Sequence, residues 1–247
     1  MSNEITAGVV LKTKFVDKDN KVRGKAVETF AGYIKYIDRN EAIRNQNFSR
    51  YNLFTDYADG YMNNPDKTSG LFDAHNERLS KEQLTSLKSD FQKSFDSNGI
   101  MWQTVISFDN RFLVQLEIYD PETGILDESI LHAATRRMME DALQKEGMTH
   151  TAVWAAAIHY NTYNIHIHIA YTEPSNTRPI KVVDGKAVPK GYFSAKTLRS
   201  MKSKVVNTLL ENEYTLLDKL VREKFIGGKK SNLSFEDRQL RDLWHRI

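Results

Sequence analysis

Short segments of apolar and β-branched residues predict the strands of this protein. Residues 9–16 (VVLKTKFV) begin with two apolar residues and then loosely alternate, and residues 101–108 (MWQTVISF) are aromatic and β-branched. Two further segments, 152–159 and 164–171, stand on either side of a short turn at 160–163. We therefore expect these last two strands to form a hairpin.

Apolar residues at helical spacing predict a helix after the first strand. From Glu28 onward the apolar residues fall on one broad stripe, which consists of Phe30, Tyr33, Ile34, Ile37 and Ile43. The following residues, 48–72, are rich in Tyr, Phe, Asn, Asp and Gly, which indicates an ordered irregular segment. The polar, charged stretch between the first strand and this helix is expected to be a loop or hairpin tip.

The other helices are expected to begin at Ser or Asp residues, whose side-chain oxygens accept bonds from free backbone N–H groups. They run from Ser80 to Ser97, from Asp127 to Glu146, from Ser194 to Phe225 and from Ser234 to Ile247. Residues 178–191, which contain Gly and Pro, predict a projecting loop or hairpin. Together the elements predict an α/β (α+β) fold, a sandwich in which helices flank a central antiparallel sheet.

The composition excludes several functional classes. The 247 residues are 40% hydrophobic and 27% charged and include no cysteine, which excludes disulfide scaffolds, zinc fingers, iron–sulfur sites and cysteine nucleophiles. No apolar run approaches the roughly 18–20 residues of a membrane helix, and the N-terminus lacks a signal-peptide pattern. We therefore expect a cytoplasmic protein without membrane insertion.

The net charge of +3 says little about partners, but the charges are unevenly distributed. Residues 71–150 hold 14 acidic and 8 basic side chains, whereas residues 178–204 hold 8 basic side chains and one acid, Asp184. A basic segment of this kind is typical of a nucleic-acid-binding face, although a solvated loop has the same composition.

Three histidines lie close together in the segment HYNTYNIHIHIAY. Residues two apart on a strand point to the same face, so His166 and His168 project together, and the hairpin brings His159 to their side. With a turn that pairs Tyr160 and Tyr163, the expected cross-strand pairs are His159 with Asn164, Ala157 with His166, and Ala155 with His168. The alanines would leave an open shelf above the imidazoles, and three neutral imidazoles on one shelf can bind a divalent cation.

Two tyrosines in the first helix are candidates for a nucleophile. Tyr33 and Tyr36 in YIKYIDR are one turn apart and share a helix face. An isolated pair of this kind is more often packed in a core with its hydroxyls at the surface. A phenol with a pKa near ~10 needs a base or a transition state already neutralised by a metal ion, and a three-histidine site could supply the latter.

These motifs and their flanking segments carry a resemblance to a known family. A tyrosine in YIDR followed at a distance by HxxxxxxHxH is similar to conjugative relaxases of the HUH endonuclease superfamily, of the MobP class. The chain resembles the MobL-type relaxases of Gram-positive plasmids from about Gly8 to Asn207, in GVVLKTKFV, YIKYIDRNEAIRN, NNPDKTSGLF, MWQTVISFDN, AVWAAAIHYNTYNIHIHIA and GYFSAKTLRSMKSKVVN.

The resemblance implies a chemistry and a fold. It implies an HUH-type sandwich whose tyrosine hydroxyl attacks a phosphodiester in single-stranded DNA at the origin of transfer, leaving a 5′-phosphotyrosine and a free 3′-OH that can be rejoined. The family pattern matches Tyr36 better than Tyr33, and it matches His159, His166 and His168 to the metal ligands. Mn or Mg is the implied ion, with Zn, Ni and Co as other possibilities. Relaxosome accessory proteins and a coupling protein are the implied partners.

DNA contacts are expected from cations and exposed aromatics. The basic segment follows the histidine hairpin in the chain, which favours DNA binding through Arg178, Lys181, Lys190 and Lys196. Bases can stack on aromatic rings, and the candidates near the histidines or the basic segment are Tyr160, Tyr163, Tyr171 and Tyr192. Arg39 and Ser107 are further candidates for phosphate contacts.

One position departs from the family pattern, and other functions stay open. Many relatives of the MobP class have Asp two residues after the first histidine, where this chain has Asn161. Asp38 and Glu173 are weak replacements, so the general base is unassigned. The alternative functions are a rolling-circle replication initiator, a non-catalytic DNA-binding module, and a three-histidine oxygenase or hydrolase of small molecules.

We expect a relaxase domain over residues 1–226 and a C-terminal helical extension over residues 227–247. The boundary falls at the Gly227-Gly228 break. Because the chain ends within an amphipathic segment, the extension is expected to lead into a further C-terminal region.

Overall fold

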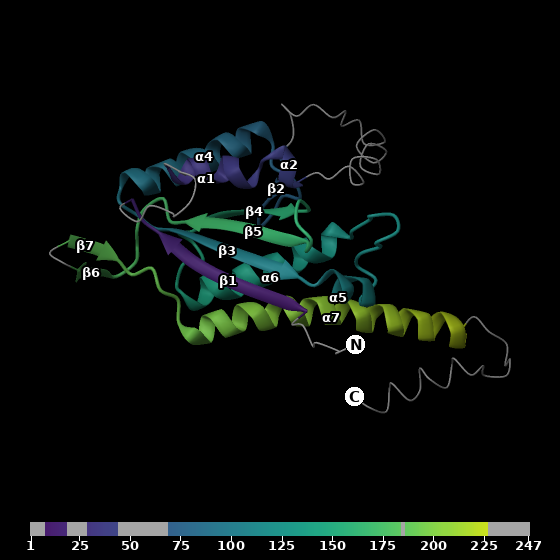
Figure 1. Ribbon diagram of the computed structural model, residues 1–247. Coiled ribbons are helices and arrows are strands. Elements are labelled where there is room, and N and C mark those ends of the chain that lie inside the picture. The colour runs from purple at the N-terminus through teal and green to yellow at the C-terminus, as the bar shows by residue number, and fades with distance from the viewer. Residues whose placement is uncertain (1–7, 19–28, 44–68, 184–185, 227–247) are drawn as a thin grey trace, which may run out of the picture. The chain divides into compact units, whose positions relative to one another are not determined.

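The computed structural model describes residues 8–18, 29–43, 69–183 and 186–226, and its centre is one antiparallel sheet (Figure 1). The sheet is five-stranded in the order β1-β3-β5-β4-β2, and the strands are β1 (Val9–Val16), β2 (Leu71–Phe72), β3 (Met101–Phe108), β4 (Val153–His159) and β5 (His166–Thr172). The predicted strands are confirmed. The strand β2 was not predicted, because two residues are too few to show a strand pattern in the sequence.

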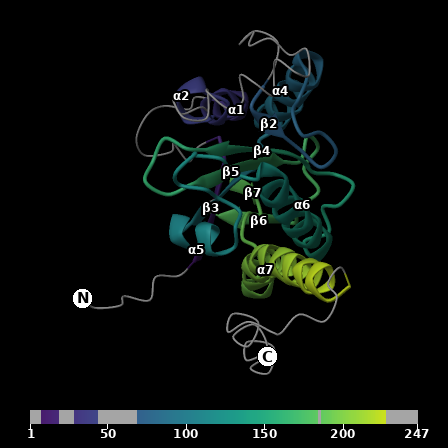
Figure 2. The ribbon, with the colours of Figure 1, turned by 90° about the vertical axis from the view of Figure 1, so that its right-hand side faces the viewer.

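Helices cover both faces of the sheet (Figure 2). Those of the described residues are α1 (Phe30–Ile37), α2 (Asn40–Ile43), α4 (Lys81–Asp96), α5 (Asn110–Gln115), α6 (Glu128–Lys145) and α7 (Ala195–Ile226). The expected α/β sandwich around a central antiparallel sheet is therefore confirmed.

The two faces of the sheet are packed differently because successive residues on a strand point to opposite sides. One face presents large side chains such as Trp102, Ile167 and Tyr171, which are buried together with apolar residues of α6 and α7. The other face presents Ala155 and Ala157 beneath residues of α1 and α4. Small side chains on this second face let the tyrosine helix approach the sheet closely.

Local signals set the helix ends. Ser80 and Gln83 form a reciprocal capping box at the start of α4, and Asn98, in the left-handed region with a φ of 56°, follows its end. Asp127 accepts a bond from a backbone N–H at the start of α6, as expected from the sequence. The predicted first helix is divided into α1 and α2, and its apolar stripe is buried.

The basic stretch forms a second, two-stranded sheet of β6 (Ile180–Val183) and β7 (Lys186–Pro189). Its base is anchored by Arg178, which donates to the backbone oxygens of Lys190 and Glu146 and forms an ion pair with the Glu146 carboxylate. Trp102 Nε1 donates to Gly191 O nearby. The predicted hairpin is thus present, and its base is bonded to the main body of the first unit.

Two compact units divide the chain after Leu210, so that α7 begins in the first unit, Met1–Leu210, and ends in the second, Glu211–Ile247. The expected helix over 234–247 and most of the irregular segment 48–72 lie outside the described residues. No helix in the described ranges is both long and apolar enough to cross a membrane.

Candidate metal centre and tyrosine helix

The hairpin of β4 and β5 brings the three histidines together. One ring nitrogen from each of His159, His166 and His168 lies within 4.8 Å of the others. The cross-strand pairs are His159 with His166 and Ala157 with His168, so the predicted pairing is wrong by two residues although the predicted face is right.

The connection between β4 and β5 is longer than the predicted turn, because the backbone of the connecting residues forms hydrogen bonds with neighbouring elements. Tyr160 N donates to Ala42 O in α2, and Ile165 N donates to Asn110 Oδ1 at the start of α5. Asn110 Nδ2 also donates to Tyr163 O. Residues 160–165 are therefore held by neighbouring elements and form no tight turn.

Each histidine uses one ring nitrogen for a bond within the protein. His159 Nε2 lies 2.7 Å from Ile37 O, and His166 Nδ1 lies 3.0 Å from Asn164 O. His168 Nδ1 lies 3.4 Å from the Tyr33 hydroxyl. Bonds of this kind fix the tautomer and the ring orientation of metal-binding histidines.

The remaining nitrogens suit a cation. His159 Nδ1 is buried and has no hydrogen-bond partner in the described part of the structure, which is costly unless a ligand is bound. Three clustered imidazole nitrogens form a donor set that accepts divalent first-row metals. The residues present therefore fit the divalent ion expected from the sequence.

Burial keeps all three imidazoles neutral. Desolvation lowers the pKa of His159 from 6.5 to about 4 and that of His168 to about 3, and it also lowers the pKa of His166. After desolvation, the neighbouring histidines and the Arg39 guanidinium are smaller causes of the lowered pKa of His159 and His168. Neutral imidazoles are the form that binds metal.

The two tyrosines of α1 differ in exposure. Tyr33 is buried, and burial raises its pKa above the ordinary value of 10. Tyr36 is 41% exposed, its ring is stacked on Tyr33, and its ring centroid lies 6.3 Å from that of His168. Tyr36 is therefore accessible to a macromolecular substrate beside the histidine cluster, whereas Tyr33 is not.

Arg39 lies against the exposed tyrosine. Its guanidinium carbon is 4.0 Å from the centroid of the Tyr36 ring, and Nη1 donates to Tyr36 O at 2.7 Å. The pair is a cation–π contact, which holds a positive charge beside the phenol and near the histidines.

Asp38 lies between α1 and α2 and joins them to β2. Its Oδ1 accepts bonds from Ser69 Oγ at 2.9 Å and Gly70 N at 2.8 Å. Glu173, the other acid weighed in place of the missing Asp, is buried beyond the far end of β5. Asn161, which stands where relatives have Asp, is exposed in the loop between the histidine strands.

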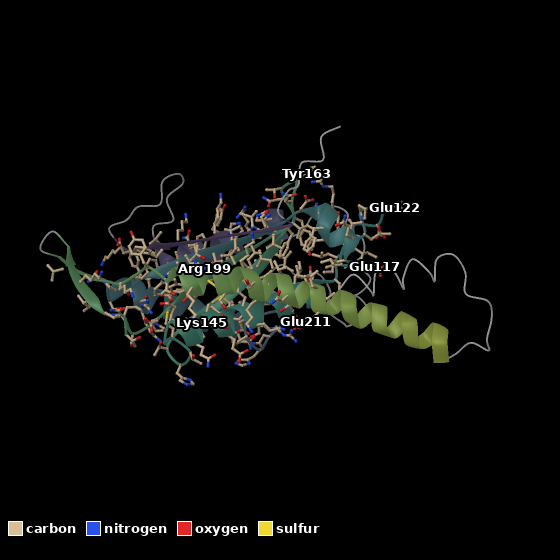
Figure 3. The ribbon with its side chains drawn as sticks, turned by 90° about the horizontal axis from the view of Figure 1, so that it is seen from below. Glu117, Glu122, Lys145, Tyr163, Arg199 and Glu211 are labelled. Atoms are coloured by element: carbon tan, nitrogen blue, oxygen red, sulfur yellow. The ribbon has the colours of Figure 1, made fainter. Side chains whose placement is uncertain are left out.

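Ser107 and Tyr163 are at the histidine end of the sheet. The register pairs Ser107 directly with His166, so the two share a face, and Tyr163 is 90% exposed in the connecting loop. Figure 3 shows Tyr163 and the β6–β7 hairpin at opposite ends of the sheet.

The basic stretch is not brought to the histidine cluster. The strand β5 carries the chain away from His166 for about 20 Å, at about 3.3 Å per residue, before the hairpin begins (Figure 1). Lys181, Lys190 and Lys196 are exposed at that distant end. Arg178 is buried and paired with Glu146, which gives it a structural role.

Two of the four tyrosines that were predicted to stack on DNA bases are too buried to do so. Tyr160 is buried and donates to Glu128 Oε1 at 2.5 Å, and Tyr171 is fully buried on the opposite face of the sheet. Tyr192 is 74% exposed near the hairpin, and its ring contacts Phe15 edge-on.

Two cations on the histidine face, Lys12 and Lys14, were not predicted from the sequence. The cross-strand pairing places Lys12 in one row with Val105 and His168, and Lys14 two rows further along on the same face. Both lysines are exposed. Their two-residue spacing on a strand predicts a common face, but only the strand order could locate that face beside the histidines.

The fold and the site together indicate the class of protein to which the chain belongs. An antiparallel sheet that carries three clustered histidines beneath a helix with an exposed tyrosine is consistent with an HUH-type sandwich. The family model of MobL relaxases matches residues 6–247, so the chain belongs to the MobL relaxase family. No curated protein and no solved structure matches it. Membership gives the chain a relaxase role in conjugation and plasmid mobilisation and implies DNA binding.

Proposed function

We propose that this protein nicks and rejoins single-stranded plasmid DNA at the origin of transfer by metal-dependent tyrosine transesterification. The observation that carries the proposal is the exposed Tyr36 beside His159, His166 and His168. A nucleophile beside three neutral imidazoles is the set of groups that this reaction needs.

Tyr36 is the proposed nucleophile. Its phenolic oxygen forms a bond to phosphorus while the bond from phosphorus to the 3′ oxygen breaks. The 5′ phosphate stays on the tyrosine, and the 3′ oxygen leaves as a hydroxyl whose proton balances the one lost by the phenol. Attack by the 3′-OH on the phosphotyrosine reverses the step and rejoins the strand.

His159, His166 and His168 are the proposed ligands of a divalent ion, with Mn or Mg expected and Zn, Ni or Co possible. When bound, the ion would polarise the scissile phosphate and offset the charge that develops during attack. The carbonyl oxygens of Ile37 and Asn164 orient two of the rings.

The other residues position the reacting groups. Tyr33 supports His168 and stacks on Tyr36, which fixes the ring of the nucleophile. Arg39 is held beside Tyr36 and can contact a phosphate that approaches the phenol. Ser107 and Tyr163 are proposed DNA contacts at this end of the sheet.

Lys181, Lys190 and Lys196 are proposed DNA contacts at the hairpin end, where they would meet DNA that extends away from the nick. We leave Arg178 out of this set, because its guanidinium is used to anchor the hairpin. On the strength of the family membership, we also propose relaxosome accessory proteins and a coupling protein as partners, and the cytoplasm as the location.

A nicking assay tests the proposal. The protein is incubated with Mn²⁺ and a labelled single-stranded oligonucleotide that covers the transfer origin of the cognate plasmid, and products are separated on a denaturing gel. We expect cleavage by the parent and by Tyr33→Phe, and none by Tyr36→Phe. Binding without cleavage by the parent, with each divalent ion in turn, would favour a non-catalytic DNA-binding module.

A further inference from the structure

A groove on the far side of β1 from the histidines has no role in the chemistry described above. It has a volume of about 500 Å³ and lies between β1 and the first half of α7, which run side by side in Figure 3 with Arg199 labelled. Its lining consists of Leu11, Thr13, Leu198, Arg199, Lys202, Ser203, Val206 and Asn207.

The lining has two cations and no acid. Arg199 and Lys202 are three residues apart on α7, so they share a helix face, and both are exposed. Neither forms an ion pair within the described ranges. Lys204, in contrast, lies near Asp141, whose pKa it helps to lower.

Another hollow of the molecule differs in charge. It has a volume of about 630 Å³, lies beside α4 and α6, and is lined by the acids Asp73, Asp90 and Glu140 in addition to Arg136. An anionic polymer is therefore expected to prefer the groove beside β1, where no carboxylate opposes it.

Positive charge continues from the groove around β1 to the histidine cluster. Lys12 and Lys14 lie on the other side of the same strand, and Lys12 shares a cross-strand row with His168. Lys12 on β1 and His168 on β5 are therefore two strand spacings of about 4.8 Å apart, or about 10 Å in total. Since β1 is the edge strand and pairs only with β3 among the described residues, its outer edge is open to a ligand.

We propose that this groove binds the phosphates of single-stranded DNA that leaves the nick site and crosses the edge of β1. The strand would pass Lys12 and Lys14 and then meet Arg199 and Lys202. A duplex, with a persistence length of about 150 base pairs, is too stiff to turn over one strand of a sheet, whereas a single strand can follow the charges. The inference rests on the proposed function, because it takes the nick to lie at the histidines.

The test measures the salt dependence of DNA binding by fluorescence anisotropy. The parent is compared with the double variant Arg199→Ala, Lys202→Ala and with a control, Lys81→Ala, Lys93→Ala, which removes the same charge from α4. Two single-stranded oligonucleotides are used, a short one limited to the nick site and a long one extended on both sides. Melting temperatures establish that each variant is folded.

With the long oligonucleotide, we expect the groove variant to bind on the order of tenfold more weakly at 0.1 M salt. The slope of log K against log salt should fall by about 1.4, from roughly 0.7 for each lost charge. The short oligonucleotide and the control should give the slopes of the parent. An unchanged slope with the long oligonucleotide, or an equal fall with the short one or in the control, would overturn the inference.

This readout is independent of cleavage. If the parent binds with the expected slopes but does not nick, the proposed reaction fails and the groove contact stands. If the parent nicks the short oligonucleotide while the groove variant keeps the parent's slope, the groove contact fails and the reaction stands.

Discussion

The two faces of the sheet are built from the same strands, yet they have different roles. On the face toward α6 and α7, large apolar residues such as Trp102 and Ile167 fill the core. On the face toward α1 and α4, small alanines lie beside three histidines, each of which forms a hydrogen bond through one ring nitrogen. The comparison teaches that the first face is filled by large apolar residues, while the second combines apolar packing against α1 and α4 with a polar site made of the three histidines.

Neighbouring residues of β5 give the largest expected contrast. Ile167 is fully buried on the packed face, so Ile167→Ala should cost about 2–5 kcal/mol in free energy of unfolding. His168→Ala should abolish Mn²⁺ binding and nicking with a much smaller loss of stability, because the side chain that it removes is polar and only half-buried. Urea unfolding and calorimetric titration with Mn²⁺ measure the two effects. A loss of stability in His168→Ala as large as in Ile167→Ala would contradict the division of the faces.

The second contrast concerns Asp38 on the site face. If its carboxylate acts by accepting bonds from Ser69 and Gly70, Asp38→Asn keeps an acceptor oxygen and should retain nicking within several-fold. Asp38→Ala removes the acceptor and should lower kcat by about 10–100-fold through displacement of α1. The measurement is kcat with saturating oligonucleotide. Equal loss of kcat in both variants would instead make Asp38 a proton acceptor.

A smaller effect is expected from Asn110, which is outside the histidine cluster. Its side chain bonds Ile165 N and Tyr163 O and so fixes the loop that presents Asn164 O to His166. Asn110→Ala should weaken Mn²⁺ binding by about tenfold, at the lower end of the effect of outer residues on metal affinity. Arg111→Ala at the neighbouring position is the matched control. Unchanged affinity in Asn110→Ala would show that the loop is set by other contacts.

The smallest effect is expected at the base of the hairpin, where Arg178 pairs with Glu146. Bonds from Thr197, Ser194 and Arg178 outweigh desolvation and hold the pKa of Glu146 below 4.5. Because the folded-state value is the lower one, the stability from this pair is present above pH 4.5 and is lost as the pH falls through the folded-state pKa. Urea unfolding at pH 7 and below pH 4 should show a smaller pH-dependent loss in Glu146→Gln than in the parent. An equal loss in both would exclude the pair as its source.

The strands and the long helices were largely predictable from the sequence. Capping residues such as Ser80 and Asp127 act locally, and the aromatic and β-branched composition of residues 101–108 is a property of one strand. The face shared by the three histidines was predictable for the same reason, because it depends only on the two-residue period of a strand.

The features that could not be predicted from the sequence depend on contacts between distant segments. The pairing of His159 with His166 follows from bonds of the connecting loop to Ala42 and Asn110, which no local pattern reveals. The distance of the basic hairpin from the histidines follows from the length and direction of β5. The burial of Arg178 follows from its ion pair with Glu146. The position of Lys12 beside His168 required the strand order.

The central claim is that Tyr36 forms a covalent bond to DNA beside the three histidines. The most direct test incubates the protein with Mn²⁺ and the transfer-origin oligonucleotide, digests it, and locates the DNA-bearing peptide by mass spectrometry. We predict a nucleotide adduct on Tyr36, and none when His168 is replaced by alanine. An adduct on Tyr33, or on a residue outside α1, would contradict the assignment of the nucleophile.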